Sequence, residues 1–212
     1  MKVLICESNQ SSLRALTEAI AASRDFSVVA VARTGRETIE VLNSGEVDIA
    51  IHSRDTVAIP GLIRSALVGG VASSVRRILA TDNPSAPLVV RAHQFGFDGL
   101  VGLPDSAKDL SLNLLEVLSG RASLADHPIV RRLGLTAGMM DRTLVYADDF
   151  EAHVADLLGL GLTDDEVSDA LSAPIQRVRN SIAAIIEANG LRTRTQLCVL
   201  HAVNVQVPEF AS

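Results

Sequence analysis

The stretch from Gly161 to Leu197 constrains the fold of this 212-residue chain more than any other segment. Thr163 is predicted to cap a helix, because its hydroxyl can accept a backbone N–H and three acidic residues that favour a helix N-terminus follow it. The i, i+3, i+4 spacing of one buried helix face is found at Val167, Ala170 and Leu171. Pro174 then begins a second helix after a very short break, since proline is tolerated at a first helical position. Such a break predicts two helices at a steep angle.

The second predicted helix separates its apolar side chains from its polar ones. Its buried stripe is predicted to consist of Val178, Ile182, Ile185 and Ile186. Arg177, Arg179 and Asn180 project elsewhere, and from the N-terminal half of a second helix such groups can reach phosphates and base edges in a major groove. Gly190 is predicted to end the helix in a left-handed conformation. Two further guanidinium groups follow, on Arg192 and Arg194.

This stretch resembles the LuxR-type helix-turn-helix of the NarL/FixJ response regulators. Family members read GLSNKEIA before the turn, TVKNHV after it and LGVRNRTEL at the end, and here the same places read GLTDDEVS, RVRNSI and NGLRTRTQL. The resemblance implies an all-α four-helix domain that binds double-stranded DNA as a homodimer. Its first helix is predicted at 148–158 and its fourth at 195–203. In the family the fourth helix forms the dimer contact, which implies a stripe of Leu197, Leu200 and Val203.

Strands and helices alternate along the first 120 residues. Short apolar runs predict strands at 2–6, 26–31, 47–51, 77–81 and 99–103. Helices are predicted between them, beginning at Ser11 and Ser12, at Thr34, at Ile59, at Pro84 and at Ser106. Five such units favour right-handed crossovers and a flavodoxin-like (βα)5 sheet, parallel and covered on both faces. The functional cleft of such a sheet lies at the carboxyl ends of its first and third strands.

The residues at those strand ends resemble a degenerate, atypical receiver domain. A working receiver holds Mg²⁺ with paired acids after strand one, accepts phosphate on an Asp that ends strand three, and grips it with a Thr and a Lys. Here VLICES, VDIAIHS, ILAT and GLVGLP stand at these places. The corresponding residues are Glu7, Ser8, Ser53, Thr81 and Leu103. Glu7 keeps one carboxylate, and Thr81 matches the family.

This set of residues is poorly suited to aspartyl phosphorylation, since a hard cation needs several oxygen ligands and an acyl phosphate needs an acceptor carboxylate. Strand alternation should direct His52 away from the cleft if Ser53 faces it, which leaves Asp55 as the only substitute acceptor. We therefore expect control without Asp phosphorylation, by a partner, a small ligand or abundance. Several arginines of this domain have two interpretations. They could bind an anionic ligand, or they could simply pair with neighbouring acidic residues. These arginines are Arg54, Arg64, Arg76, Arg77 and Arg91.

Composition and charge restrict the function further. The chain has 48% hydrophobic residues, two cysteines and a net charge of −6, and no apolar run long enough to span a membrane. No secretory signal, cofactor motif, metal-ligand spacing or catalytic constellation is recognisable, so we expect a cytoplasmic protein that is not an enzyme. The predicted domains are a receiver-like domain at 1–120, a linker at 121–147 with a turn at Pro128, a helix-turn-helix domain at 148–205 and a tail at 206–212.

One feature argues against DNA binding. Residues 148–204 contain nine acidic side chains and four arginines, a net charge of −5, whereas phosphate neutralisation supplies much of the affinity for DNA. All four arginines lie on or directly after the second helix of the motif, so the local charge there is expected to be positive. Two hypotheses follow: a DNA-binding transcriptional regulator, and a protein-interaction module that pairs with another regulator or a kinase and binds DNA weakly or not at all.

Overall fold

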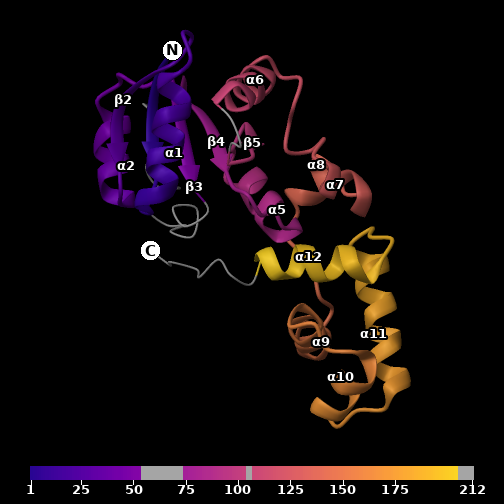
Figure 1. The fold of residues 1–212 in the computed structure, drawn as a ribbon. Coiled ribbons are helices and arrows are strands. Elements are labelled where there is room, and N and C mark those ends of the chain that lie inside the picture. Colours follow the sequence, from indigo (N-terminus) through magenta and orange to yellow (C-terminus); the bar gives the residue numbers. More distant parts are fainter. Residues whose placement is uncertain (54–73, 104–106, 205–212) are drawn as a thin grey trace. The chain divides into compact units, whose positions relative to one another are not determined.

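The computed structural model describes residues 1–53, 74–103 and 107–204 (Figure 1). The chain divides into two compact units. The first unit comprises Met1–Pro84 and Ala92–His127, and the second comprises Ser85–Arg91 and Pro128–Ser212.

The first unit contains a five-stranded parallel sheet in the order β2-β1-β3-β4-β5. Its strands are β1 Lys2–Cys6, β2 Ser27–Ala32, β3 Ile49–Ser53, β4 Arg76–Ala80 and β5 Gly99–Val101. The helices described between and after them are α1 Gln10–Ala21, α2 Gly35–Asn43, α5 Ala86–Gln94 and α6 Ala107–Leu118. This strand order confirms the predicted flavodoxin-like topology. The helix predicted from Ile59 lies outside the described residues.

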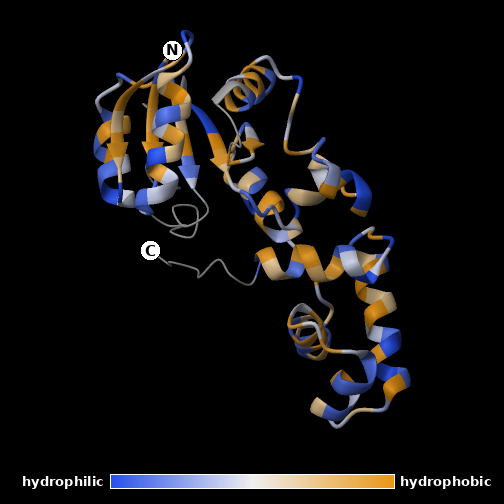
Figure 2. Cartoon of the chain, viewed as in Figure 1, coloured by the Kyte–Doolittle hydropathy of each residue, from blue (hydrophilic) through white to orange (hydrophobic). Residues whose placement is uncertain are grey.

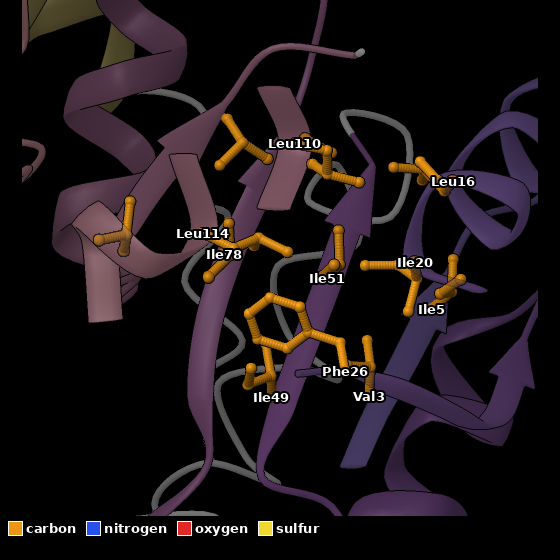
Figure 3. Close-up of a cluster of buried hydrophobic side chains, with 14 of the residues drawn as sticks. Val3, Ile5, Leu16, Ile20, Phe26, Ile49, Ile51, Ile78, Leu110 and Leu114 are labelled. Atoms are coloured by element: carbon orange, nitrogen blue, oxygen red, sulfur yellow. The ribbon is translucent and has the colours of Figure 1, made fainter. Parts of the chain in front are cut away.

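Two apolar layers hold the sheet, as expected when helices cover both faces. Val3, Ile5, Ile51 and Ile78 belong to the layer that α1 and α6 cover, together with Leu16, Ile20, Phe26, Leu110 and Leu114 (Figure 3). Leu4, Cys6 and Leu42 belong to a second layer, on the side of α2. Figure 2 shows largely hydrophobic strands beside helices of mixed hydropathy. Burial raises the pKa of the Cys6 thiol to about 12, so this thiol is an inert core group.

Several predicted details of the first unit are wrong. The cap of α1 is Asn9 rather than Ser11 or Ser12, because the Asn9 side chain accepts the backbone N–H groups of both serines. β3 begins two residues later than the apolar run, although Val47 is buried before it.

The second unit is helical from its first residues onward. From Pro128 onward its helices are α7 Pro128–Leu133, α8 Ala137–Met140, α9 Asp149–Gly159, α10 Asp164–Ala170, α11 Ile175–Ala188 and α12 Arg194–Asn204. Pro128 begins α7 instead of making the turn predicted in the linker. The Gln196 side chain donates to the carbonyls of Leu133 and Gly134, which fastens the end of α7 to α12. None of the described helices is both long and apolar enough to cross a bilayer.

The motif formed by α10 and α11 follows the predicted pattern at its boundaries. Thr163 caps α10 and forms a capping box with Glu166, whose pKa is held below its usual range by the hydrogen bonds from Thr163. Ser172 adopts φ +49° in the break between the helices, and Gly190 adopts φ +63° after α11. The predicted inner face of α10 is only partly correct. Val167 is buried, but Ala170 is exposed, and Leu171, which follows the last residue of α10, is half-buried.

Candidate nucleic-acid interface and receiver cleft

The second helix of the motif, α11, presents its predicted polar side chains to solvent. Val178, Ile182 and Ile185 are buried, whereas Ile186 is half-buried. The side chains of Arg177, Arg179 and Asn180 are all exposed. The period of the helix produces this division, because residues three or four apart share a face and the intervening ones do not.

Arg177 and Asn180 each contact a neighbouring side chain. The guanidinium carbon of Arg177 lies 4.0 Å from the centre of the Phe150 ring, in a cation–π contact with α9. Such contacts contribute about 0.5–1 kcal/mol at exposed sites and restrict where the cation can move. The Asn180 amide oxygen accepts a hydrogen bond of 2.9 Å from Gln176, one turn earlier. The sequence gives no sign of this contact, since nothing in the spacing of Phe150 points to an arginine on another helix.

The other three arginines of the motif differ in their surroundings. Arg194 donates from Nη1 to Asp164 at 2.7 Å and from Nη2 to the Leu162 carbonyl at 2.5 Å, so its guanidinium connects α12 to the start of α10. Arg179 Nε lies 3.5 Å from the same carboxylate. Arg192, which follows Gly190, has an exposed side chain. The structure therefore leaves Arg192 available for a phosphate and engages Arg194 inside the unit.

The stripe predicted for dimerisation is inside the second unit. Leu197, Leu200 and Val203 are each at most 1% exposed, and α12 packs against α9 and α11. His201 on the same helix is bonded to Asp156 of α9 at 3.0 Å, and its burial lowers its pKa although Asp156 opposes this effect. These side chains are thus core residues in this structure, and a dimer contact through them remains a prediction.

The carboxyl ends of β1, β3 and β4 surround a hollow of about 190 Å³ in the first unit. Among the described residues it is lined by Glu7, Asn9, Ser12, Ser53, Ala80, Thr81, Asp82 and Leu103. The structure therefore brings together four of the five residues predicted for the degenerate site. Ser8 is exposed and does not line the hollow. Asp82 was missed, although its place directly after Thr81 at the end of β4 was a usable signal.

The lining residues do not fit the phosphorylation chemistry of a working receiver. Glu7 is buried, and one of its oxygens already accepts the backbone N–H of Asn9 at 2.7 Å. The Thr81 hydroxyl oxygen accepts the backbone N–H of Asn83 at 3.2 Å. Ser53 ends β3, where the chemistry needs a carboxylate that can form an acyl phosphate. Leu103 brings no cation to the cleft. Asp55 lies outside the described residues.

His52 lies on the opposite side of β3 from the cleft, as strand alternation predicted. It is fully buried, and its ring packs edge-on to Phe97 with centroids 5.2 Å apart. Among the residues that the structure describes, neither ring nitrogen has a hydrogen-bond partner. Burial, with a smaller contribution from the nearby Arg77 charge, lowers the pKa of His52 to about 4. This histidine is therefore neutral at physiological pH.

The arginines of the first unit that the structure describes are largely engaged. Arg76 pairs with Asp98 at 2.6 Å, and Arg77 donates to the Phe95 carbonyl at 2.9 Å. Burial lowers the pKa of Arg77 and also that of Arg91, which belongs to the second unit. These contacts favour the structural interpretation of Arg76 and Arg77. Arg54 and Arg64 lie outside the described residues.

The sheet with its cleft and the helix-turn-helix define a receiver-like domain followed by a helical domain that contains a helix-turn-helix. No protein-family model matches the sequence. The chain is 22% identical over 209 residues to the transcriptional regulatory protein LnrK of Bacillus subtilis strain 168, covering 94% of this chain and 95% of LnrK.

Solved structures show the same fold over nearly the whole chain. The two-component response regulator RcsB in complex with DNA superposes with a TM-score of 0.63 at 18% identity, over 96% of this chain and 98% of that one. A structure of two RcsB dimers bound to two parallel DNAs gives a TM-score of 0.63 at 17% identity, with the same coverage. The chain thus has the two-domain fold of a NarL/FixJ-type response regulator, as the resemblance predicted.

Proposed function

We propose that this chain is a transcriptional regulator of the response-regulator type that binds double-stranded DNA through α11. Arg177, Arg179 and Asn180 read base edges in the major groove, and Arg192 contacts a phosphate. The observation that carries the proposal is the solvent exposure of these four side chains on and directly after the second helix of a helix-turn-helix. The DNA-bound state of the RcsB structures with this fold supports it.

The acidic composition of the second unit limits the affinity of a single copy. Few phosphates are neutralised by the exposed arginines, and each neutralised phosphate releases counterions that drive binding. Two copies of the protein on adjacent half-sites double the number of contacts with DNA. Half-sites about one helical turn apart match the spacing of the two recognition helices in a dimer with two-fold symmetry. We therefore propose that the chain acts on DNA as a homodimer, and the binding of RcsB to DNA as dimers supports this proposal.

A salt titration of DNA binding tests this proposal. Duplexes selected from a random library by the full-length protein serve as the probe. Arg192→Ala should weaken binding to all sequences alike and reduce the salt slope by about 1, whereas Arg179→Ala should cost about 1–3 kcal/mol and relax the preference at one base position. Arg131→Ala, which removes an exposed arginine from α7, is the matched control. A salt-independent Kd, or equal effects of all three changes, contradicts the proposal.

We further propose that the receiver-like domain works without aspartyl phosphorylation. Ser53 and Leu103, at the ends of β3 and β5, lack the carboxylate and the cation that the reaction needs. A small ligand, a protein partner or the amount of the protein then sets its activity. Incubation with a small phospho-donor and Mg²⁺ should leave the intact mass and the DNA affinity unchanged. A phosphoryl adduct, located by peptide mapping on Asp55 or elsewhere, refutes this part.

A second candidate function is a protein-interaction module with little or no DNA binding. Two observations favour it: the net charge of −5 over 148–204, and the pairing of Arg179 and Arg194 with one carboxylate. In that case the full-length protein forms a stable hetero-complex with another regulator or a kinase and retains no DNA. Measuring the DNA affinity of the free protein and of the purified complex at low salt distinguishes the two functions.

A further inference from the structure

Asp164, the first residue of α10, lies between two arginines of the helix-turn-helix unit. Arg194 Nη1 lies 2.7 Å from Asp164 Oδ1, and Arg179 Nε lies 3.5 Å from Asp164 Oδ2. One carboxylate therefore connects an arginine of α11 to an arginine at the start of α12 through its two oxygens. The Asp164 side chain is 26% exposed and that of Arg179 is 54% exposed, so the carboxylate is the more buried partner.

The atoms involved matter for recognition. The ion pair reaches Arg179 through Nε, whereas bidentate recognition of guanine can use the two terminal nitrogens of a guanidinium. The contact between Asp164 and Arg179 Nε therefore restrains the planar guanidinium group without occupying both of its terminal N–H donors. An arginine that is restrained before binding loses less side-chain freedom when it meets a base.

We infer that Asp164 is a positioning residue that sets the base specificity of Arg179. This inference rests on the proposed DNA-binding function. Arg194 supports Asp164 from behind, because its second terminal nitrogen donates to the Leu162 carbonyl at 2.5 Å. The order of contacts is thus the Leu162 carbonyl, Arg194, Asp164 and Arg179. Arg194 affects DNA recognition through Asp164 and not by touching the duplex.

A carboxylate near a DNA-binding helix also repels phosphates, and this effect must be separated from positioning. Asp165 provides the control, because it lies in the same first turn of α10 and has an exposed side chain. Asp164→Asn and Asp165→Asn remove the same charge from neighbouring positions and weaken the acidic start of α10 similarly. Only Asp164→Asn removes the ion pair with Arg179.

The experiment compares the Kd for a duplex selected by the full-length wild type with the Kd for a scrambled duplex of equal length. Both changes should tighten binding to the scrambled duplex, since each removes a negative charge. Asp164→Asn should lower the ratio of specific to non-specific affinity by about three- to tenfold, a partial loss of one base contact. Asp165→Asn should leave this ratio within about twofold of the wild type. Thermal unfolding followed by circular dichroism confirms that both variants fold.

Arg194→Gln tests whether Arg194 affects the specificity of Arg179 through Asp164. It should reproduce the loss of specificity of Asp164→Asn, and the double variant should lose no more than either single one, because all three interrupt the same order of contacts. An unchanged ratio in Asp164→Asn, or an equal fall in Asp165→Asn, overturns the inference while leaving DNA binding intact. A wild type that prefers no sequence overturns the proposed function itself, and the two failures are therefore distinguishable.

Discussion

Acidification from pH 7 to pH 5 should destabilise the first unit by an amount that His52 largely determines. The ring is fully buried and has no hydrogen-bond partner in the described part of the chain, and its pKa falls from the ordinary 6.5 to about 4. The folded state therefore binds the proton less tightly than the unfolded chain does. The stability that the neutral His52 side chain contributes to the folded state is fully present above pH 6.5, and it is lost progressively as the pH falls towards 4.

The magnitude follows from the two pKa values. Each tenfold difference in proton affinity corresponds to about 1.4 kcal/mol, so the loss is limited to roughly 3 kcal/mol and reaches about 2 kcal/mol between pH 7 and pH 5. His52→Leu should abolish this loss. At pH 7 the variant should be about as stable as the wild type, because an apolar group replaces two unpaired nitrogens while an edge-on contact with Phe97 disappears.

Native-state hydrogen exchange read by mass spectrometry measures the effect locally. Peptides from β1, β3 and β4 report the opening free energy of the first unit at each pH, after correction for the intrinsic exchange rate. His153→Leu is the control, since this histidine is exposed on α9 in the second unit. Equal losses of protection in the wild type and in His52→Leu would show that another group titrates, and the argument from burial would be wrong.

Three further predictions concern the second unit, and each is measured by urea unfolding. Thr163→Ala should cost about 1 kcal/mol, because the capping box with Glu166 is lost. Asn189→Ala should cost about 2 kcal/mol, since the Asn189 amide both accepts from and donates to the backbone of Val145. Leu200→Ala should cost about 2–5 kcal/mol at every protein concentration if Leu200 is a core residue, whereas a loss that depends on concentration indicates a dimer contact.

The strands and helices of the first unit could be predicted well because each carries a local pattern. The apolar run from Lys2 to Cys6 is the strand β1 itself, and the spacing of apolar residues placed α6 to within one residue. The cap of α1 could not be chosen in the same way, since Asn9, Ser11 and Ser12 are all good capping residues. The backbone geometry decides among them, and it places the Asn9 side chain within reach of two N–H groups.

The segment before the helix-turn-helix was predicted poorly because its structure depends on distant residues. Pro128 reads equally as a turn or as the first residue of a helix, and the chain uses it to begin α7. The helix end is fastened by Gln196, whose side chain donates to the Leu133 and Gly134 carbonyls about sixty positions earlier. No periodicity within the segment contains this information. The segment predicted as a linker therefore contains two short helices, α7 and α8, that its local sequence does not indicate.

The acidic side chains of the second unit also differ in whether their partners are local or distant in the sequence. Several of its nine acidic residues act on helix N-termini: Asp148 accepts the backbone N–H of Glu151, Glu151 accepts that of Ala147, and Glu166 accepts that of Thr163. These carboxylates compensate backbone donors and helix dipoles, so the formal sum of −5 overstates the repulsion that a duplex meets at α11. Asp164 differs from them, because its partners are arginines and one of them lies on α11. Under the proposed DNA-binding function, the effect of charge would therefore depend on this one carboxylate more than on the total, and a count of residues cannot reveal it.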